Sequence, residues 1–299
     1  MLGDIIMKKF GQLCLCAVPL LSVFLIENLV IFFFMGIAFL VELIYYKCIG
    51  TVDPWFIYED IFNLLMETDF NTYIMVMYAI IAIAVFGIWY YAQYNGNYLP
   101  KVKTIFHPIS IVGIIVLVPG AQYLTSYLVT IISAIFPSWL EAYEELMESA
   151  GMDDTLTFGL FLYSVILAPI AEELTCRGIT LSQAKKVLPF WLANILQALL
   201  FGVLHMNMLQ GTYAFCLGLI LGFLFEKSGS LYPPILFHML FNFFGTVLSE
   251  YMPYGDSDFA FIFWFLFGLA ATIGGIALYI TGTKQAKGNV SVSPNSVTF

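Results

Sequence analysis

The chain has 299 residues, of which 61% are hydrophobic and only 10% carry a charge. Soluble domains do not reach this composition, which excludes a soluble globular protein and predicts an all-α, polytopic membrane protein embedded in the lipid bilayer. The formal net charge is −9, so the chain lacks the excess of basic residues expected of a nucleic-acid-binding protein.

The first half of the chain predicts three membrane spans and two amphipathic helices. Apolar runs long enough to cross a bilayer lie at about residues 10–46, 73–91 and 105–136, and the first predicts one kinked or tilted helix. Within that first run, Glu27 and Glu42 are expected at an interface or a helix end rather than on a polar pathway. Apolar residues recur at helical spacing in the acidic segments 51–72 and 137–154, which predicts helices that lie in the membrane interface.

The second half of the chain predicts five further spans, which brings the total to about eight. We expect them at about residues 156–177, 190–208, 212–225, 234–248 and 259–280. The sixth span carries Gly218-x-x-x-Gly222, a small-residue pattern typical of helices that pack closely. Residues 1–283 are therefore predicted to form a single helical transmembrane domain. The polar, Ser-rich tail 284–299 is predicted to be disordered and cytoplasmic.

The distribution of lysines predicts how the chain is oriented in the membrane. Almost all lysines fall on one side of the eight-span count, whereas the other side holds acidic clusters and Lys47 as its only cation. By the positive-inside rule, both the N-terminus and the C-terminus are expected in the cytoplasm.

Polar side chains stand out inside three of the later spans, where such groups normally face a polar cavity or a partner. They are Glu172, Glu173 and Arg177 in the fourth span, His205 in the fifth, and His238 and Asn242 in the seventh. Glu173 and Arg177 are four residues apart, and so are His238 and Asn242, so each pair projects from one helix face. The clustering favours a shared functional site over six separate packing groups.

These residues resemble the motifs of the CAAX-protease and bacteriocin-processing family of intramembrane endopeptidases, also called the CPBP or Abi family. Its pattern is Glu-Glu-x-x-x-Arg, then Phe-x-x-x-His, then His-x-x-x-Asn or His-x-x-x-Asp, on successive transmembrane helices. The chain contains Glu172-Glu173-x-x-x-Arg177, Phe201-x-x-x-His205 and His238-x-x-x-Asn242 in this order. The motifs span about residues 167–244, a quarter of the chain, within a core of about 156–250. Cys176 stands where the family often has an aromatic residue.

The resemblance implies an endopeptidase that cleaves a peptide or a membrane-associated or lipidated protein. Peptide hydrolysis needs a base that activates water and donors that stabilise the developing oxyanion. Glu172 is the expected base, and His205 is expected to help hold the water. His238 and Asn242 are donors suited to an oxyanion hole, which is also the role that the resemblance implies. Glu173 and Arg177 are expected to form an ion pair that keeps Glu172 in place.

A zinc-dependent version of the same protease is the rival chemistry. Glu172, His205 and His238 would supply a His₂Glu ligand set with an open fourth position. The sequence lacks the His-Glu-x-x-His motif of zincins, and we favour glutamate-activated water, which requires no cofactor. The five cysteines show no Cys-x-x-Cys spacing, so neither disulfides nor a structural zinc site is predicted.

Two functions from other classes also fit these residues. Glu, His and Arg side chains within spans build proton relays, which indicates a proton-coupled transporter as one alternative. A non-catalytic membrane scaffold or immunity protein is the other. A relay spreads its groups along an axis across the membrane, whereas a hydrolase gathers them in one blind-ended cavity. We expect this cavity between the membrane midplane and the cytoplasmic side.

Overall fold

The computed structural model describes residues 2–50, 53–66, 68–93, 105, 107–151, 156–253 and 257–291. Within these ranges the regular elements are all helical, so the predicted all-α class is confirmed. Six helical segments are long and apolar enough to cross a membrane, and Phe190–Leu204 and Tyr232–Leu248 are shorter apolar helices. The chain is therefore a multi-pass integral membrane protein.

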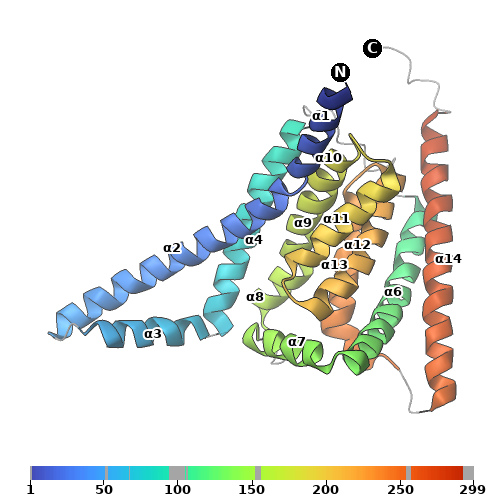
Figure 1. Ribbon diagram of the computed structural model, residues 1–299. Helices are drawn as coiled ribbons and strands as arrows, with labels where there is room; N and C mark the ends of the chain where they lie inside the picture. Colours follow the sequence, from blue (N-terminus) through green and yellow to red (C-terminus); the bar gives the residue numbers. More distant parts are fainter. Residues whose placement is uncertain are drawn as a thin grey trace.

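The N-terminal helices form a wing that projects from the rest of the molecule (Figure 1). The long first helix predicted from the sequence is two helices, α1 (Leu2–Leu15) and α2 (Val18–Ile49), because the chain turns at Cys16 and Ala17 and a proline stands in the first turn of α2. The predicted helices that follow are α3 (Pro54–Met66) and α4 (Thr68–Gln93). Ile57 and Ile61 of α3 pack against Ala38 of α2.

The remaining helices form a bundle beside the wing (Figure 1). Besides the fourth span, described below, they are α6 (Pro108–Ile135), α11 (Phe190–Leu204), α12 (Met208–Ser228), α13 (Tyr232–Phe243), its continuation η3 (Phe244–Leu248) and α14 (Asp258–Ser291). The amphipathic helix predicted within 137–154 is α7 (Pro137–Ser149), which has no buried residue and crosses one end of the bundle (Figure 1). Its interfacial position stays a prediction.

The fourth span is longer and less regular than its sequence predicts. It consists of α8 (Phe158–Phe161), the π-helix η1 (Leu162–Leu167), α9 (Ala168–Glu173), the π-helix η2 (Leu174–Leu181) and α10 (Ser182–Ala184). A side-chain hydroxyl also bonds the backbone within η2: Thr180 Oγ1 donates to the Thr175 carbonyl, five residues earlier, at 2.9 Å. The span therefore passes its predicted end at Arg177 and continues to Ala184.

The last helix also extends past its predicted end. α14 continues to Ser291, so residues 284–291 are helical and not disordered as predicted, and the rest of the predicted tail lies outside the described residues. The helix packs along α6 through glycines: a Cβ on Gly275 would lie 2.7 Å from the backbone nitrogen of Leu117. This backbone approach holds α14 in register with α6 through the membrane.

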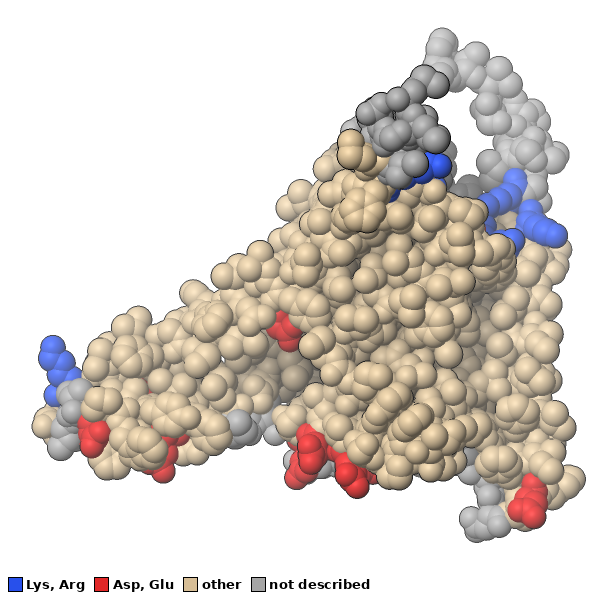
Figure 2. Space-filling model, viewed as in Figure 1, with Lys and Arg blue, Asp and Glu red and all other residues tan. Residues whose placement is uncertain are grey.

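Charged side chains separate to opposite ends of the bundle (Figure 2). We call one of these ends the lysine end. There, Lys185 and Lys186 follow α10, Lys227 lies in the last turn of α12, Lys284 and Lys287 lie toward the end of α14, and Lys9 lies on α1, which contacts α10. Three contacts join the elements there: Lys287 Nζ donates to the Lys227 carbonyl at 2.7 Å, Lys185 pairs with Glu226, and Gln12 bonds Gln183. The opposite, acidic end carries α7 with Glu141, Glu144, Glu145 and Glu148.

The small-residue pattern of the sixth span packs α12 closely against α11. A Cβ on Gly218 would meet Ala198 Cβ at 3.0 Å, and a Cβ on Gly222 would overlap the side-chain oxygen of Asn194. Asn194 itself donates to the Leu219 carbonyl at 3.0 Å, so it has little freedom to move away. The predicted role of Gly218-x-x-x-Gly222 is confirmed.

We expect Gly222→Ala to destabilise the protein, because the new methyl group displaces Asn194 from a packed interface at a cost of about 1 to 3 kcal/mol. Thermal unfolding of the detergent-solubilised protein measures the effect. Gly274→Ala is the matched control, since nothing lies within 4 Å of a Cβ at that position in the same kind of helix. Equal melting temperatures for the two variants would contradict the prediction.

Candidate active site

One cavity of about 720 Å³ collects polar side chains from several helices. Of the six residues predicted for the site, Glu172, His205, His238 and Asn242 line it. Glu173 and Arg177 do not line it and lie fully buried behind it. The cavity has the size of a typical ligand pocket, and the structure separates the predicted residues into a lining group and a supporting group.

The predicted ion pair between Glu173 and Arg177 forms within the fourth span. Arg177 Nη1 donates to Glu173 Oε1 at 2.7 Å, and both side chains have no exposed surface. Arg177 Nη2 also donates to the Gly218 carbonyl of α12 at 3.3 Å, and its guanidinium carbon lies 4.4 Å from the centre of the Phe201 ring. The arginine thus ties the fourth span to α11 and α12.

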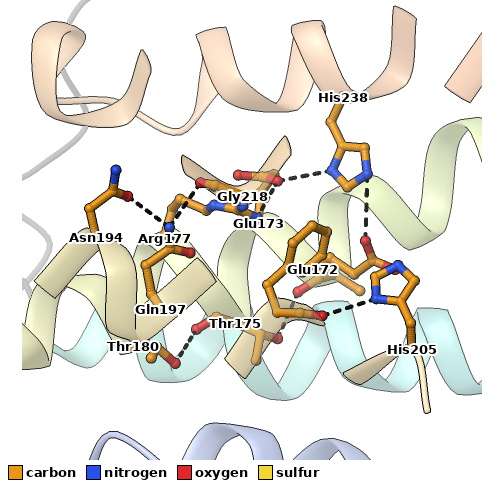
Figure 3. Close-up of polar contacts among 12 residues, drawn as sticks. Glu172, Glu173, Thr175, Arg177, Thr180, Asn194, Gln197, His205, Gly218 and His238 are labelled. Atoms are coloured by element: carbon orange, nitrogen blue, oxygen red, sulfur yellow. Dashed lines mark hydrogen bonds and ion pairs between the residues drawn. The ribbon is translucent and has the colours of Figure 1, made fainter. Parts of the chain in front are cut away.

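His238 bridges the two glutamates, a contact that the sequence did not predict (Figure 3). Its Nδ1 lies 2.9 Å from Glu173 Oε1, and its Nε2 lies 3.6 Å from Glu172 Oε2. Because a carboxylate next to an arginine accepts hydrogen bonds, Nδ1 carries a proton and Nε2 faces Glu172. The side chain of Glu172 is 25% exposed, whereas that of Glu173 is 0% exposed, so only Glu172 can meet water in the cavity.

His205 caps the C-terminal end of α11, and one of its ring nitrogens is already hydrogen-bonded. Its Nδ1 lies 2.9 Å from the Phe201 carbonyl, which can only accept, so Nδ1 donates and the lone pair of a neutral ring is on Nε2. The Phe201 ring stands edge to face with both His205 and His238, at centroid distances of 5.0 and 5.8 Å. Phe201 therefore restricts the planes of the two imidazoles.

Asn242 lies on the same helix as His238 and is anchored to the fourth span. Its Nδ2 donates to the Ser164 carbonyl at 2.8 Å, which uses one of its two N–H groups. Gln122 of α6 donates to the Phe241 carbonyl at 3.1 Å, beside Asn242 in the chain. These bonds hold the end of α13 in place on both sides.

Several residues that line the cavity were not predicted from the sequence. They are Gln122, Tyr78, Tyr163, Ser164 and Glu27. Glu27 was expected at an interface or helix end, but it faces the cavity from the first third of α2. Its carboxylate inside an apolar run was the available signal. The others are ordinary residues of amphipathic membrane helices, and no local pattern distinguishes them.

The site lies further from the lysine end than predicted. The fourth span continues to Ala184, so Glu172 lies twelve residues, or about 18 Å, from that end of the span. His205 lies fifteen residues, or about 22 Å, from the start of α11 at Phe190. The two groups reach similar depths because the fourth span is longer than predicted.

The three predicted metal ligands do not form a metal site in this arrangement. Among the described residues, no three His, Cys, Asp or Glu side chains form a group that could hold a metal ion. Glu172, His205 and His238 are of the right chemical types, but their side chains as placed do not fit a zinc ion.

A partly exposed glutamate, two histidines and an amide therefore share one cavity between apolar helices. Residues 154–244 match the family model described as Type II CAAX prenyl endopeptidase Rce1-like. The chain therefore carries an Rce1-like domain, and this domain contains all six candidate residues.

One curated relative is described as a membrane peptidase. A stretch of 90 residues is 24% identical to "Putative membrane peptidase YdiL" of Bacillus subtilis (strain 168), which covers 30% of this chain and 37% of that protein. No solved structure matches the chain. The wing and α6, which contribute to the cavity, lie outside the matched family region.

Proposed function

We propose that this protein is an intramembrane endopeptidase that hydrolyses a peptide bond with water activated by Glu172. The observation that carries the proposal is the contrast between two adjacent carboxylates. Glu173 is fully buried in an ion pair with Arg177, whereas Glu172 remains partly exposed in a cavity that it shares with His205 and His238. A general base has to reach its water, and Glu172 does.

In this mechanism the attacking water lies between Glu172 and His205. The water donates one hydrogen to the Glu172 carboxylate and the other to Nε2 of His205, which leaves a lone pair directed at the scissile carbonyl carbon. Glu172 takes the proton as the carbon–oxygen bond forms, and then delivers it to the leaving amine. The apolar walls around the site strengthen these interactions by lowering the local dielectric.

His238 and Asn242 stabilise the oxyanion in the same step. To act as a donor, His238 uses Nε2, because its Nδ1 already contacts Glu173. Asn242 has one N–H group left after its bond to the Ser164 carbonyl. The two donors come from one helix face, as the substrate carbonyl requires.

We expect Asn242→Ala to reduce turnover by about 10² to 10³, as for the loss of one oxyanion donor, with little effect on KM. Asn28→Ala is the control, because Asn28 bonds the Phe24 carbonyl of its own helix and does not line the cavity. Turnover of Asn242→Ala within threefold of the control would remove Asn242 from the mechanism.

The substrate is found by comparing the peptides of membranes that hold the wild-type protein with those that hold Glu172→Gln. Fragments that appear only with the wild-type protein identify the cleaved bond and supply the assay for every kinetic test. Nothing in the sequence specifies a prenyl group, so this comparison also decides whether the substrate is lipidated. Identical peptide sets would argue for a scaffold or immunity protein instead.

Elemental analysis separates the glutamate mechanism from a zinc-dependent one. We expect the purified active protein to contain no stoichiometric zinc and to keep its turnover in a chelator, because the candidate ligands do not form a metal-binding group. Stoichiometric zinc that is lost in His238→Ala, but kept in a fully active Asn242→Ala, would establish the metalloprotease.

The confinement of the polar groups disfavours a proton-coupled transporter. A relay spreads its titratable groups along an axis across the membrane, whereas Glu172, His205 and His238 line one cavity. Polar groups that gather in one cavity are the arrangement expected of a hydrolase.

A further inference from the structure

On three helices of the bundle, the cavity lining is confined to the half that is remote from the lysine end. On α11 the lining residues are Phe201 and Leu204 in the last turn, followed by His205. On α12 they are confined to the first half, from Gln210 to Leu217, and on α6 to the second half, from Gln122 to Thr130. All three sets lie away from the helix ends that meet the lysines.

A plug of apolar side chains closes the lysine end. It consists of buried residues that lie in or beside helix ends: Cys16, Leu181, Ala184, Ala193, Phe225 and Leu231. Between this plug and the cavity lies the buried network of Arg177, in which the Gly218 carbonyl also accepts from Gln197 at 2.9 Å. Two layers thus separate the cavity from the lysine end.

The acidic end, by contrast, borders the cavity directly. Tyr143, Leu146 and Met147 of α7 line it, and Thr246 and Ser249 line it near the same end, where both are exposed. α7 is attached to the bundle by a bond from Asn207 Nδ2 to the Ala142 carbonyl at 3.2 Å. The lining contains no lysine or arginine among the described residues. Water and substrate therefore have their route at this end.

The lysines indicate which side of the membrane this is. Lysines that flank membrane spans favour the cytoplasm. The six lysines named above lie at the lysine end, whereas Lys47 lies in the last turn of α2, at the far end of the wing. We infer that the active-site cavity opens on the non-cytoplasmic side of the membrane, and that the enzyme cleaves peptide bonds presented from that side.

This inference rests on the proposed function for the chemistry and narrows its substrate class. The substrate is a membrane-anchored peptide or protein whose cleaved bond lies outside the cytoplasm, at the depth of Glu172. A lipidated C-terminus that remains in the cytoplasm would face the apolar plug and could not reach the glutamate. The inference thus separates this chain from the substrate named by its family model.

Site-directed thiol labelling tests the orientation without any need for activity. In a background where the exposed Cys14, Cys48 and Cys216 are serine, single cysteines are placed at Thr246 in the cavity, Glu145 on α7 and Lys186 at the lysine end. Spheroplasts of a bacterial host are treated with a membrane-impermeant maleimide before and after permeabilisation. The parent background without the new cysteines reports labelling of the buried Cys16 and Cys176.

We expect Thr246→Cys and Glu145→Cys to react fully in intact spheroplasts and Lys186→Cys to react only after permeabilisation. Labelling of Lys186→Cys in intact spheroplasts, with protection of Glu145→Cys, would overturn the orientation. Labelling of Glu145→Cys without labelling of Thr246→Cys would overturn the opening of the cavity. The same three cysteine variants are also labelled in a Glu172→Gln background, and we expect the same labelling pattern there. Labelling thus tests the orientation alone, whereas turnover tests the proposed chemistry, so the two can fail separately.

Discussion

Glu172→Gln is expected to lower turnover by at least about 10³, with normal abundance and an unchanged melting temperature. The amide keeps the shape of the side chain and its place near His238 Nε2, but it cannot accept the proton of the attacking water. Because the side chain is partly exposed, the fold does not depend on its charge. Cleavage of the substrate identified from the membrane peptides measures the loss.

Two further variants serve as comparisons in this experiment. Glu226→Gln alters an exposed carboxylate at the lysine end and should keep full turnover. Glu173→Gln alters the other motif carboxylate, which is buried between Arg177 and His238, and should reduce abundance along with activity. Substantial turnover in purified Glu172→Gln would refute the glutamate-base mechanism, whatever the other two variants do.

Arg177→Ala is expected to destabilise the protein by about 3 to 5 kcal/mol, because it leaves Glu173 as an uncompensated charge in a site with no exposed surface. It also removes the donor to the Gly218 carbonyl that ties the fourth span to α12. We expect a fall in melting temperature on the order of 10 °C in detergent, and lower abundance in the membrane.

Lys185→Ala is the matched control for this loss. Lys185 also pairs with a glutamate, but its side chain is 36% exposed, and a pair of this kind contributes about 0 to 1 kcal/mol. The difference between the melting temperatures of the two variants therefore measures the effect of burying an ion pair, not of having one. If both variants unfold at the wild-type temperature, the Arg177 pair does not stabilise the fold.

The sequence predicted those features that depend on short-range patterns. Long apolar runs placed the spans, and the spacing of Glu173 and Arg177 predicted their ion pair, because residues four apart on a helix face the same way. The small-residue pattern of α12 likewise predicted close packing. Each of these inferences needs only one helix and its period.

Features that depend on tertiary contacts could not be predicted from the sequence. The π-helices η1 and η2 lengthen the fourth span, and their hydrogen bonds leave no mark in hydrophobic periodicity. The contact of His238 with Glu173 joins residues 65 positions apart. Glu27 was assigned to an interface because a glutamate in a lone helix is best placed there, and only the packing of α2 on the bundle gives it a cavity to face.

The apolar plug at the lysine end has a consequence for the cell that concerns energy rather than catalysis. An enzyme that hydrolyses bonds inside a bilayer must admit water, and a continuous column of water would conduct protons and collapse the gradient across the membrane. Because Leu181, Phe225 and Leu231 close the lysine end, water in the cavity does not extend across the whole membrane. The hydrolase can thus draw its reactant from one compartment while the membrane remains electrically insulating.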